Sequence, residues 1–233
     1  MTLLAAKLLA SYLLGSVVGS LLLGRMRGVD IRTQGSGNAG ATNALRTQGK
    51  TFALGTALID FGKGALAAAL IAPIGWHALA PLGLVETQLA CGLGAALGHC
   101  YPLWHGFRGG KGAGTLFGML AWLFPSTAAA VFVVWALVLT GSGYVGLSTV
   151  LAGLAFPMLL PVIRGWPGGM LMSLALTCGL LLLWTHRSNL ARLRSGTEHR
   201  FEKARIWAHW LASPAPPAKE VKDAKDAKDT RGT

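Results

Sequence analysis

The sequence predicts an all-α fold, a polytopic bundle of about seven transmembrane helices. Of its 233 residues, 52% are hydrophobic and 13% are charged, whereas soluble domains are about 25% charged. The charges are also clustered: Glu86 is the only acidic or basic residue between positions 71 and 107, apart from histidines, and Arg164 is the only one between positions 112 and 185. Apolar stretches of this length are typical of membrane spans.

Hydropathy and length predict seven spans. They cover residues 3–24, 52–74, 79–100, 113–124, 126–139, 145–163 and 170–184. We interpret the first as a retained helix, because its apolar stretch is too long for a signal peptide and Arg25 and Arg27 follow as a stop-transfer pattern. The fourth and fifth spans are short and meet at Pro125, which leaves open whether they are two helices or one re-entrant pair.

Lysine and arginine residues in the loops predict the orientation. With the N-terminus outside, 13 basic residues face the cytoplasm and two, Lys7 and Arg164, face the outside. The 13 are Arg25, Arg27, Arg32, Arg46, Lys50, Arg108, Lys111, Arg187, Arg192, Arg194, Arg200, Lys203 and Arg205. We therefore expect an inner-membrane protein whose polar loops and C-terminus are cytoplasmic.

Residues 1–212 are predicted to form one integral membrane domain, and residues 213–233 a disordered, charged tail that cannot bury a core. The net charge of +12 would suit nucleic acid, anionic lipid or an anionic substrate. In a membrane protein we interpret it as a topology signal and predict no nucleic-acid partner. The three cysteines lack metal-ligand spacing, and Asp, Glu and His do not cluster, so we expect no metal and no cofactor.

A first glycine-rich segment, residues 35–46, reads GSGNAGATNALR. Its G-x-G-x-x-G pattern is not a dinucleotide fingerprint, because no strand precedes it. Exposed backbone amides and neutral donors instead predict an anion-binding loop, or else a merely flexible turn. The candidate residues are Gly35, Ser36, Gly37, Asn38, Gly40, Thr42 and Asn43.

A second glycine-rich segment, residues 98–115, reads GHCYPLWHGFRGGKGAGT. It is not a P-loop, because Gly112 rather than Ser or Thr follows Lys111. Gly109, Gly110 and Gly112 nevertheless surround this lysine where a helix begins, which favours a phosphate site. The alternative is a lysine that only sets the topology.

A third polar segment, residues 185–200, reads THRSNLARLRSGTEHR. His186 and Asn189 are three residues apart and so share a helix face. Glu198 is either part of a site or a solvated surface acid. Within the second span, Asp60 and Lys63 are spaced to pair, and the sequence leaves open whether this pair is structural or belongs to an active site.

These segments, together with DFGKG at residues 60–64, resemble the acyl-phosphate:glycerol-3-phosphate acyltransferases of bacterial phospholipid synthesis. The motifs occur in family order over roughly residues 1–205, and the family has seven transmembrane helices with an external N-terminus. The chain departs from the family at Thr185, where arginine is usual, and at Gly146, where serine is usual. The resemblance implies transfer of a fatty acyl group from acyl phosphate to the 1-hydroxyl of glycerol 3-phosphate.

On that reaction, residues 36–43 are expected to bind the acyl-phosphate head group, and Arg46 and Lys111 the phosphate of the acceptor. Gly109, Gly110, Gly112 and Glu198 complete the predicted substrate contacts. Ser36, His186 and Asn189 are the catalytic candidates, with His186 and Asn189 orienting the attacking hydroxyl. Its proton acceptor is either His186 or a donor phosphate oxygen. The expected partners are membrane lipids and the soluble enzyme that makes acyl phosphate.

Two other functions remain open from the residues alone. A transporter would explain the glycine-rich spans and the Asp60–Lys63 pair, although transporter sites usually lie near the midplane. Another lipid-phosphate enzyme would use the same anion-binding segments, although its usual acidic metal ligands are scarce here.

Overall fold

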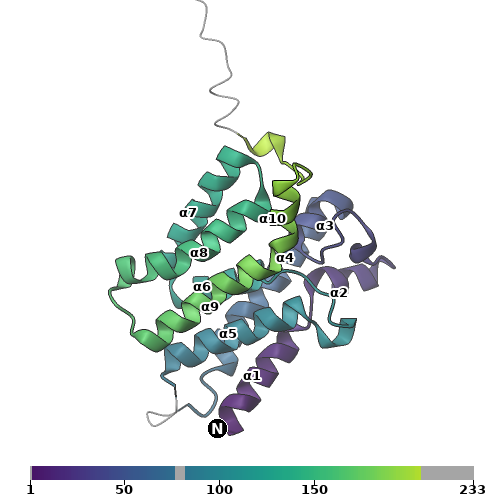
Figure 1. Ribbon diagram of the computed structural model, residues 1–233. Helices are drawn as coiled ribbons and strands as arrows, with labels where there is room; N and C mark the ends of the chain where they lie inside the picture. The colour runs from purple at the N-terminus through teal and green to yellow at the C-terminus, as the bar shows by residue number, and fades with distance from the viewer. Residues whose placement is uncertain (1, 77–81, 206–233) are drawn as a thin grey trace, which may run out of the picture.

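The computed structural model describes residues 2–76 and 82–205, and throughout this part of the chain the regular structure is helical, with no β-strand (Figure 1). The α-helices are α1 (Thr2–Gly15), α2 (Gly19–Met26), α3 (Ala41–Gln48), α4 (Lys50–Leu66), α5 (Leu84–Cys100), α6 (Ala113–Leu123), α7 (Pro125–Ser142), α8 (Val145–Arg164), α9 (Gly169–Thr185) and α10 (Arg187–Arg194). Short 3₁₀ turns lie at Ile31–Thr33, Leu103–His105 and Glu202–Ala204.

Each predicted span coincides with a helix or a bent helix pair, but the first is not one continuous helix. It divides into α1 and α2, whose axes differ by 44°. The second span, α4, continues into a wider π-helical turn at Ala67–Ile71. The predicted start of the third, at residue 79, lies outside the described residues, as does the predicted tail at residues 213–233.

The fourth and fifth spans are two separate helices that meet at Phe124, which caps both α6 and α7. Pro125 is the first residue of α7, where its missing N–H costs no hydrogen bond. By length and composition, three of the described helices suffice to cross a membrane, or up to five when each bent pair counts as one span. The 11-residue α6 is shorter than such a span, so the predicted number of seven is approximate.

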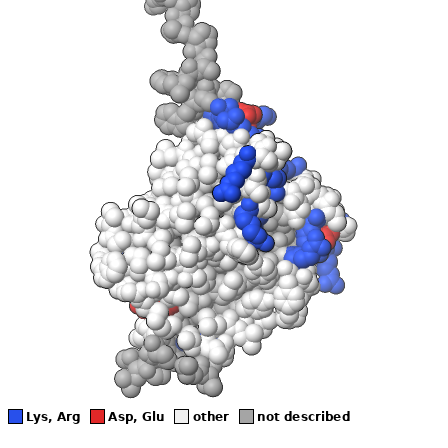
Figure 2. Space-filling view, viewed as in Figure 1, with Lys and Arg blue, Asp and Glu red and all other residues white. Residues whose placement is uncertain are grey.

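The outer surface of the bundle is apolar. Leu58, Met158 and Val162 are 64%, 71% and 80% exposed, as expected for side chains that face lipid. The face seen in Figure 2 is largely uncharged, and its lysines and arginines gather over the region where α2, α3 and α10 lie. This asymmetry fits the membrane assignment and marks one end of the bundle as polar.

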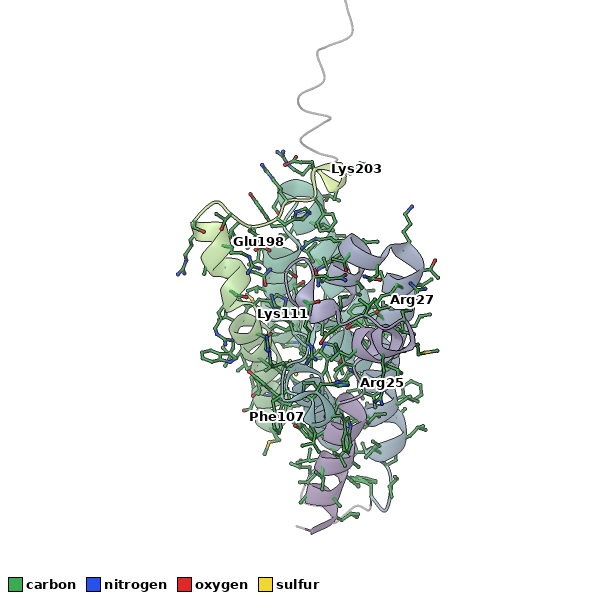
Figure 3. The ribbon with its side chains drawn as sticks, turned by 90° about the vertical axis from the view of Figure 1, so that its right-hand side faces the viewer. Arg25, Arg27, Phe107, Lys111, Glu198 and Lys203 are labelled. Atoms are coloured by element: carbon green, nitrogen blue, oxygen red, sulfur yellow. The ribbon has the colours of Figure 1, made fainter. Side chains whose placement is uncertain are left out.

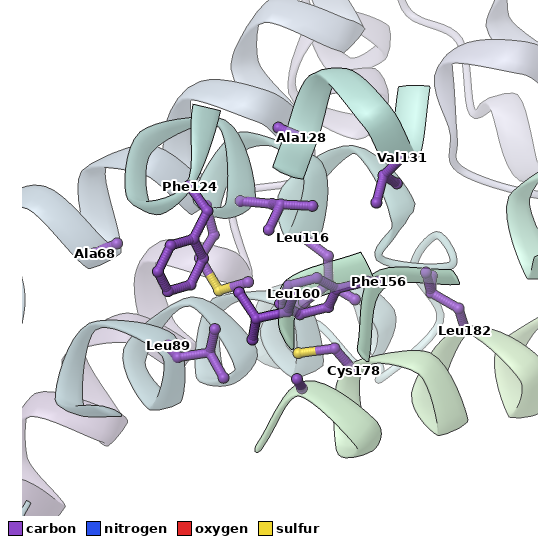
Figure 4. Close-up of a cluster of buried hydrophobic side chains, with 14 of the residues drawn as sticks. Ala68, Leu89, Leu116, Phe124, Ala128, Val131, Phe156, Leu160, Cys178 and Leu182 are labelled. Atoms are coloured by element: carbon purple, nitrogen blue, oxygen red, sulfur yellow. The ribbon is translucent and has the colours of Figure 1, made fainter. Parts of the chain in front are cut away.

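The largest buried apolar cluster joins α5, α6, α7, α8 and α9 (Figure 4). Leu89, Leu116, Phe156 and Cys178 come from four of these helices and are at most 5% exposed. Small residues allow close helix packing, which is common in membranes: Gly98 of α5 lies against the Tyr12 carbonyl of α1. The packed helices position the polar segments over one end of an internal cavity.

Candidate active site

A cavity of about 300 Å³ lies between α4, α6, α7, α8 and α9, below α3. One end is polar, and the rest is lined by apolar and aromatic side chains. The polar wall consists of Asn38, Gly40, Thr42, Asp60, His99, Lys111 and His186, and the apolar wall includes Phe61, Leu116, Phe117, Met119, Leu120, Val131, Phe132, Trp135, Phe156, Cys178 and Leu182. Such a cavity suits a ligand with an anionic head and an apolar body.

The second glycine-rich segment reaches the cavity between α5 and α9. The Gly109 and Gly110 amides donate to the carbonyls of Cys100 and His99, at 3.1 and 3.0 Å. Gly112, with a φ of +83°, precedes α6. The Thr185 hydroxyl donates to the Lys111 carbonyl at 2.9 Å, so the residue that departs from the family pattern ties this segment to α9.

Lys111 begins a chain of polar contacts that crosses to the third segment. Its Nζ donates to Asn189 Oδ1, and Asn189 Nδ2 donates to Glu198 Oε1 at 2.6 Å. Arg192 Nε donates to Glu198 Oε2 at 2.7 Å, and the Glu198 side chain is only 5% exposed. In Figure 3, Lys111 lies within the bundle with Glu198 above it. Glu198 is therefore not a solvated surface acid, and its role as a substrate contact stays a prediction.

Positive charge is concentrated around Lys111, where Arg46, Arg187 and Arg192 are close enough to act on it. Burial, followed by repulsion from Arg192, lowers the pKa of Lys111 to about 8. Burial also lowers the pKa of Arg46, whose guanidinium lies 4.8 Å from the centre of the Phe201 ring. Arg46 Nε is buried and has no hydrogen-bond partner within the described chain. An anion at this end would relieve the repulsion among these cations.

His186 lies between α9 and α10 and is 6% exposed. Its Nδ1 is 2.8 Å from the Leu182 carbonyl oxygen; because a carbonyl only accepts, Nδ1 carries the proton. Burial, followed by the charge of Lys111, lowers the pKa of His186 to about 4, so the ring is neutral at pH 7. Nε2 is then an unprotonated hydrogen-bond acceptor in the cavity wall.

The first glycine-rich segment is a loop only as far as Gly40, and its second half forms helix α3. Asn43 is buried there, and its Oδ1 accepts from the Ser36 amide at 2.9 Å. Its Nδ2 donates to the carbonyls of Ile31 and Gln34, at 3.2 and 3.0 Å. The prediction that Asn43 offers a free donor to an anion was therefore wrong: both its N–H groups bind the loop.

The other predicted residues of this segment divide into two groups. Asn38, Gly40 and Thr42 line the cavity. Gly35, Ser36 and Gly37 are exposed and are not among the lining residues. Gly35 and Gly37 have φ values of +56° and +71°, a backbone conformation that favours glycine without any contact to a ligand. The structure thus does not bring Ser36 into contact with the cavity, which leaves its catalytic assignment a prediction.

Sequence reasoning missed His99. This residue is 4% exposed, lines the cavity and contacts the Asp60–Lys63 pair, whose predicted ion pair is present at 3.0 Å. The available signal was a histidine at the polar end of an otherwise apolar span. Within residues 2–76 and 82–205, no group of three or more His, Cys, Asp or Glu side chains is arranged to hold a metal ion.

An apolar exterior and membrane-length helices define an integral membrane protein, and its internal cavity has a polar end that contains Lys111 and an otherwise apolar wall. The family model described as glycerol-3-phosphate acyltransferase matches residues 5–196. A glycerol-3-phosphate acyltransferase of Salinibacter ruber is 43% identical over 204 residues, covering 82% of this chain and 89% of the relative. One of Aquifex aeolicus is 36% identical over 192 residues, covering 82% and 95%.

Solved structures agree with the sequence comparison. The crystal structure of PlsY (YgiH), an integral membrane glycerol 3-phosphate acyltransferase in its glycerol 3-phosphate form, is 32% identical with a TM-score of 0.76. The match covers 90% of this chain and 99% of that one. The lysophosphatidic acid form of the same enzyme gives a TM-score of 0.75. This chain belongs to the glycerol-3-phosphate acyltransferase family.

Proposed function

We propose that this protein transfers a fatty acyl group from acyl phosphate to the 1-hydroxyl of glycerol 3-phosphate, forming lysophosphatidic acid and inorganic phosphate. The observation that carries the proposal is the cavity, whose polar end contains Lys111 and whose apolar body matches an acyl chain. Membership of the glycerol-3-phosphate acyltransferase family identifies glycerol 3-phosphate as the acceptor. The resemblance of the motifs indicates acyl phosphate as the donor. The reaction is a step of phospholipid synthesis.

The residues divide into two binding regions. Asn38, Gly40 and Thr42 on the first segment and the start of α3 receive the phosphate of the donor. Lys111 and Arg46 receive the phosphate of the acceptor: Lys111 donates to Asn189, which donates to Glu198, and Arg46 is close enough to Glu198 and Arg192 for their charges to act on it. The apolar wall receives the acyl chain.

His186 and Asn189 orient the acceptor. The lone pair on His186 Nε2 accepts a hydrogen bond from the 1-hydroxyl, whose oxygen attacks the acyl carbonyl carbon. A carbon–oxygen bond to glycerol forms, and the bond between the carbonyl carbon and the phosphate oxygen breaks. Because His186 is held neutral and weakly basic, we assign the final proton to the departing phosphate. Positioning and charge stabilisation provide most of the acceleration, since acyl phosphate is already activated.

We further propose that the protein resides in the bacterial inner membrane with its N-terminus outside and the active site facing the cytoplasm. The loop charge bias supports this orientation, and a soluble enzyme that makes acyl phosphate would supply the donor there. A reporter fused after Arg205 should behave as cytoplasmic. A reporter active only outside the membrane would reverse the orientation.

The decisive experiment for the activity is an assay of the purified protein in lipid or detergent. Labelled glycerol 3-phosphate is mixed with acyl phosphate or, separately, with acyl-CoA, and both lysophosphatidic acid and inorganic phosphate are measured. The proposal expects equal amounts of the two products, with acyl phosphate alone as donor. Phosphate release that does not depend on glycerol 3-phosphate would contradict it.

A further inference from the structure

The break in the first span leaves backbone groups without helical partners inside the bundle. Helix α1 ends at Gly15 and α2 begins at Gly19, with a 44° bend between them. Unsatisfied carbonyls and amides are costly in apolar surroundings, so broken helices need partners from their neighbours. The break itself consists of Ser16, Val17 and Val18, none of which has a charged side chain, and its charged partners come from elsewhere in the chain.

The Asp60–Lys63 pair on α4 provides these partners. Lys63 Nζ donates to the carbonyls of Gly15 and Val17, both at 2.9 Å. Asp60 Oδ1 accepts from the Gly19 amide at 3.0 Å. The two side chains are 3% and 5% exposed and pair at 3.0 Å. One lysine therefore satisfies the end of α1, and one aspartate the start of α2.

The direction of α2 fixes the first glycine-rich segment. Ser20, the residue after Gly19, is fully buried, and its hydroxyl donates to the Ala39 carbonyl at 2.9 Å. Ala39 lies between Asn38 and Gly40, both in the cavity wall. A shift of α2 would therefore move the predicted donor-binding residues.

His99, at the end of α5, connects the same pair to Gly110 and Lys111. Its Nδ1 lies 2.8 Å from Lys63 Nζ and 3.2 Å from Asp60 Oδ1. Its carbonyl accepts from the Gly110 amide at 3.0 Å. The imidazole lies so close to the Gly110 Cα that a Cβ there would overlap Nε2. The backbone that precedes Lys111 is therefore in direct contact with the His99 ring.

We propose that Asp60, Lys63 and His99 form a positioning cluster that sets the relative placement of the two glycine-rich segments, with His99 as the positioning residue for Lys111. The inference rests on the proposed acyl transfer, which needs the two substrates held together. A displacement of about 1 Å from reactive geometry can cost on the order of a hundredfold in rate. The cluster links α1, α2, α4 and α5, so it fixes this geometry from inside the bundle.

His99→Asn and Gly110→Ala, alone and combined, test the contact between His99 and the Lys111 backbone. Asparagine keeps a polar group near the position of Nδ1 for Lys63 and Asp60 but lacks the far ring atoms Nε2 and Cε1. Gly110 does not have a positive φ, so alanine there adds crowding without backbone strain. The same substitution at His105, a partly exposed histidine away from the cavity wall, is the matched control.

Gly110→Ala alone should raise the KM for glycerol 3-phosphate about tenfold or more, with donor KM nearly unchanged, because the methyl displaces Lys111. In the His99→Asn background the methyl occupies the vacated space, so the further change should be less than about threefold. Each variant is compared with wild type for thermal stability, which a general folding defect would lower. His105→Asn should leave every parameter unchanged.

Additive effects of the two substitutions, or equal rises in both KM values, would overturn the positioning role. A wild-type protein that makes no lysophosphatidic acid from acyl phosphate would instead contradict the proposed function, before any variant is compared. The two failures are therefore distinguishable.

Discussion

The two glycine-rich segments have similar sequences but are held in different ways. The first is held mainly by one of its own side chains: Asn43 bonds to the backbone of Ser36 and of Gln34 and Ile31 just before the segment, and the Ser20 hydroxyl of α2 adds a bond to the Ala39 carbonyl. In the second, the glycine turn is held by two helix ends: the Gly110 amide bonds to the His99 carbonyl at the end of α5, and the Lys111 carbonyl accepts from the Thr185 hydroxyl of α9. The first brings neutral groups to the cavity, and the second brings a cation, Lys111.

The glycines also serve different purposes. Gly35 adopts a φ of +56°, a conformation that side chains disfavour, whereas Gly110 is required by the closeness of the His99 ring. A glycine-rich pattern therefore does not by itself indicate a phosphate loop. Chemistry enters through the few polar groups that these backbones present to the cavity.

The largest expected effect is at Lys111. Lys111→Ala removes a cation from the acceptor phosphate, a charge-assisted contact worth about 1.5–3 kcal/mol. We expect kcat/KM for glycerol 3-phosphate to fall roughly tenfold to a hundredfold, with a smaller effect on the donor. Lys50→Ala is the control, because Lys50 is exposed at the start of α4. Normal acceptor kinetics with a raised donor KM would reverse the assignment of the two segments.

The pH dependence of kcat/KM tests the role of Lys111, the cation of the second segment. Since burial and Arg192 lower the pKa of Lys111 to about 8, its ammonium is lost above that pH. From pH 7 to pH 9 the charged fraction falls from about nine-tenths to one-tenth, so kcat/KM for glycerol 3-phosphate should drop about tenfold. Lys111→Arg stays charged and should flatten this decline. Initial rates at each pH are corrected for spontaneous donor hydrolysis; an unchanged decline in the arginine variant would assign the titration elsewhere.

Gly35→Ala tests whether Asn43 organises the first segment. The new methyl imposes a left-handed strain of about 1–2 kcal/mol and would overlap the Asn43 side-chain oxygen. We expect a lower melting temperature and a raised KM for acyl phosphate. Gly28→Ala has similar strain, with a φ of +67°, but no atom within 4 Å of the added methyl. If the two variants behave alike, Asn43 does not organise the loop.

The membrane helices were predictable because their length and low charge follow from the bilayer itself. The break at residues 16–18 was not predictable, because none of Ser16, Val17 and Val18 is a residue that indicates a helix break. The side chains that satisfy its backbone groups, Asp60 and Lys63, lie more than 40 residues away. A break that is stabilised by another helix becomes visible only when the helices are packed together.

The site was predictable where a polar residue is rare for its surroundings. Lys111, His186, Asn189 and Glu198 stand out in so apolar a chain. Lys111 and His186 line the cavity, and Asn189 and Glu198 join Lys111 through hydrogen bonds, while their roles in the reaction stay predictions. His99 was missed because its partners lie on another helix and a single histidine in a span carries no spacing signal. Asn43 was misjudged because an asparagine near a loop bonds to the backbone as readily as to a ligand.

The smallest expected effect concerns a third kind of glycine, within a helix beside the site. Gly146 of α8 is buried, and a Cβ there would lie 2.7 Å from the Asn189 Cβ and 2.9 Å from its Cγ. Gly146→Ala should displace Asn189 and weaken its contact with Lys111, lowering kcat/KM for glycerol 3-phosphate by about fivefold, or roughly 1 kcal/mol. Serine, which the family resemblance predicts at this position, brings the same Cβ and should act similarly unless Asn189 moves to accommodate it.

Gly141→Ala on α7 is the matched control, because no atom lies within 4 Å of its added methyl and alanine favours the helix by up to about 1 kcal/mol. A Gly146 variant with wild-type kinetics would mean that Asn189 holds its position without support from α8, and that the link from Lys111 to Glu198 is fixed by the third segment alone.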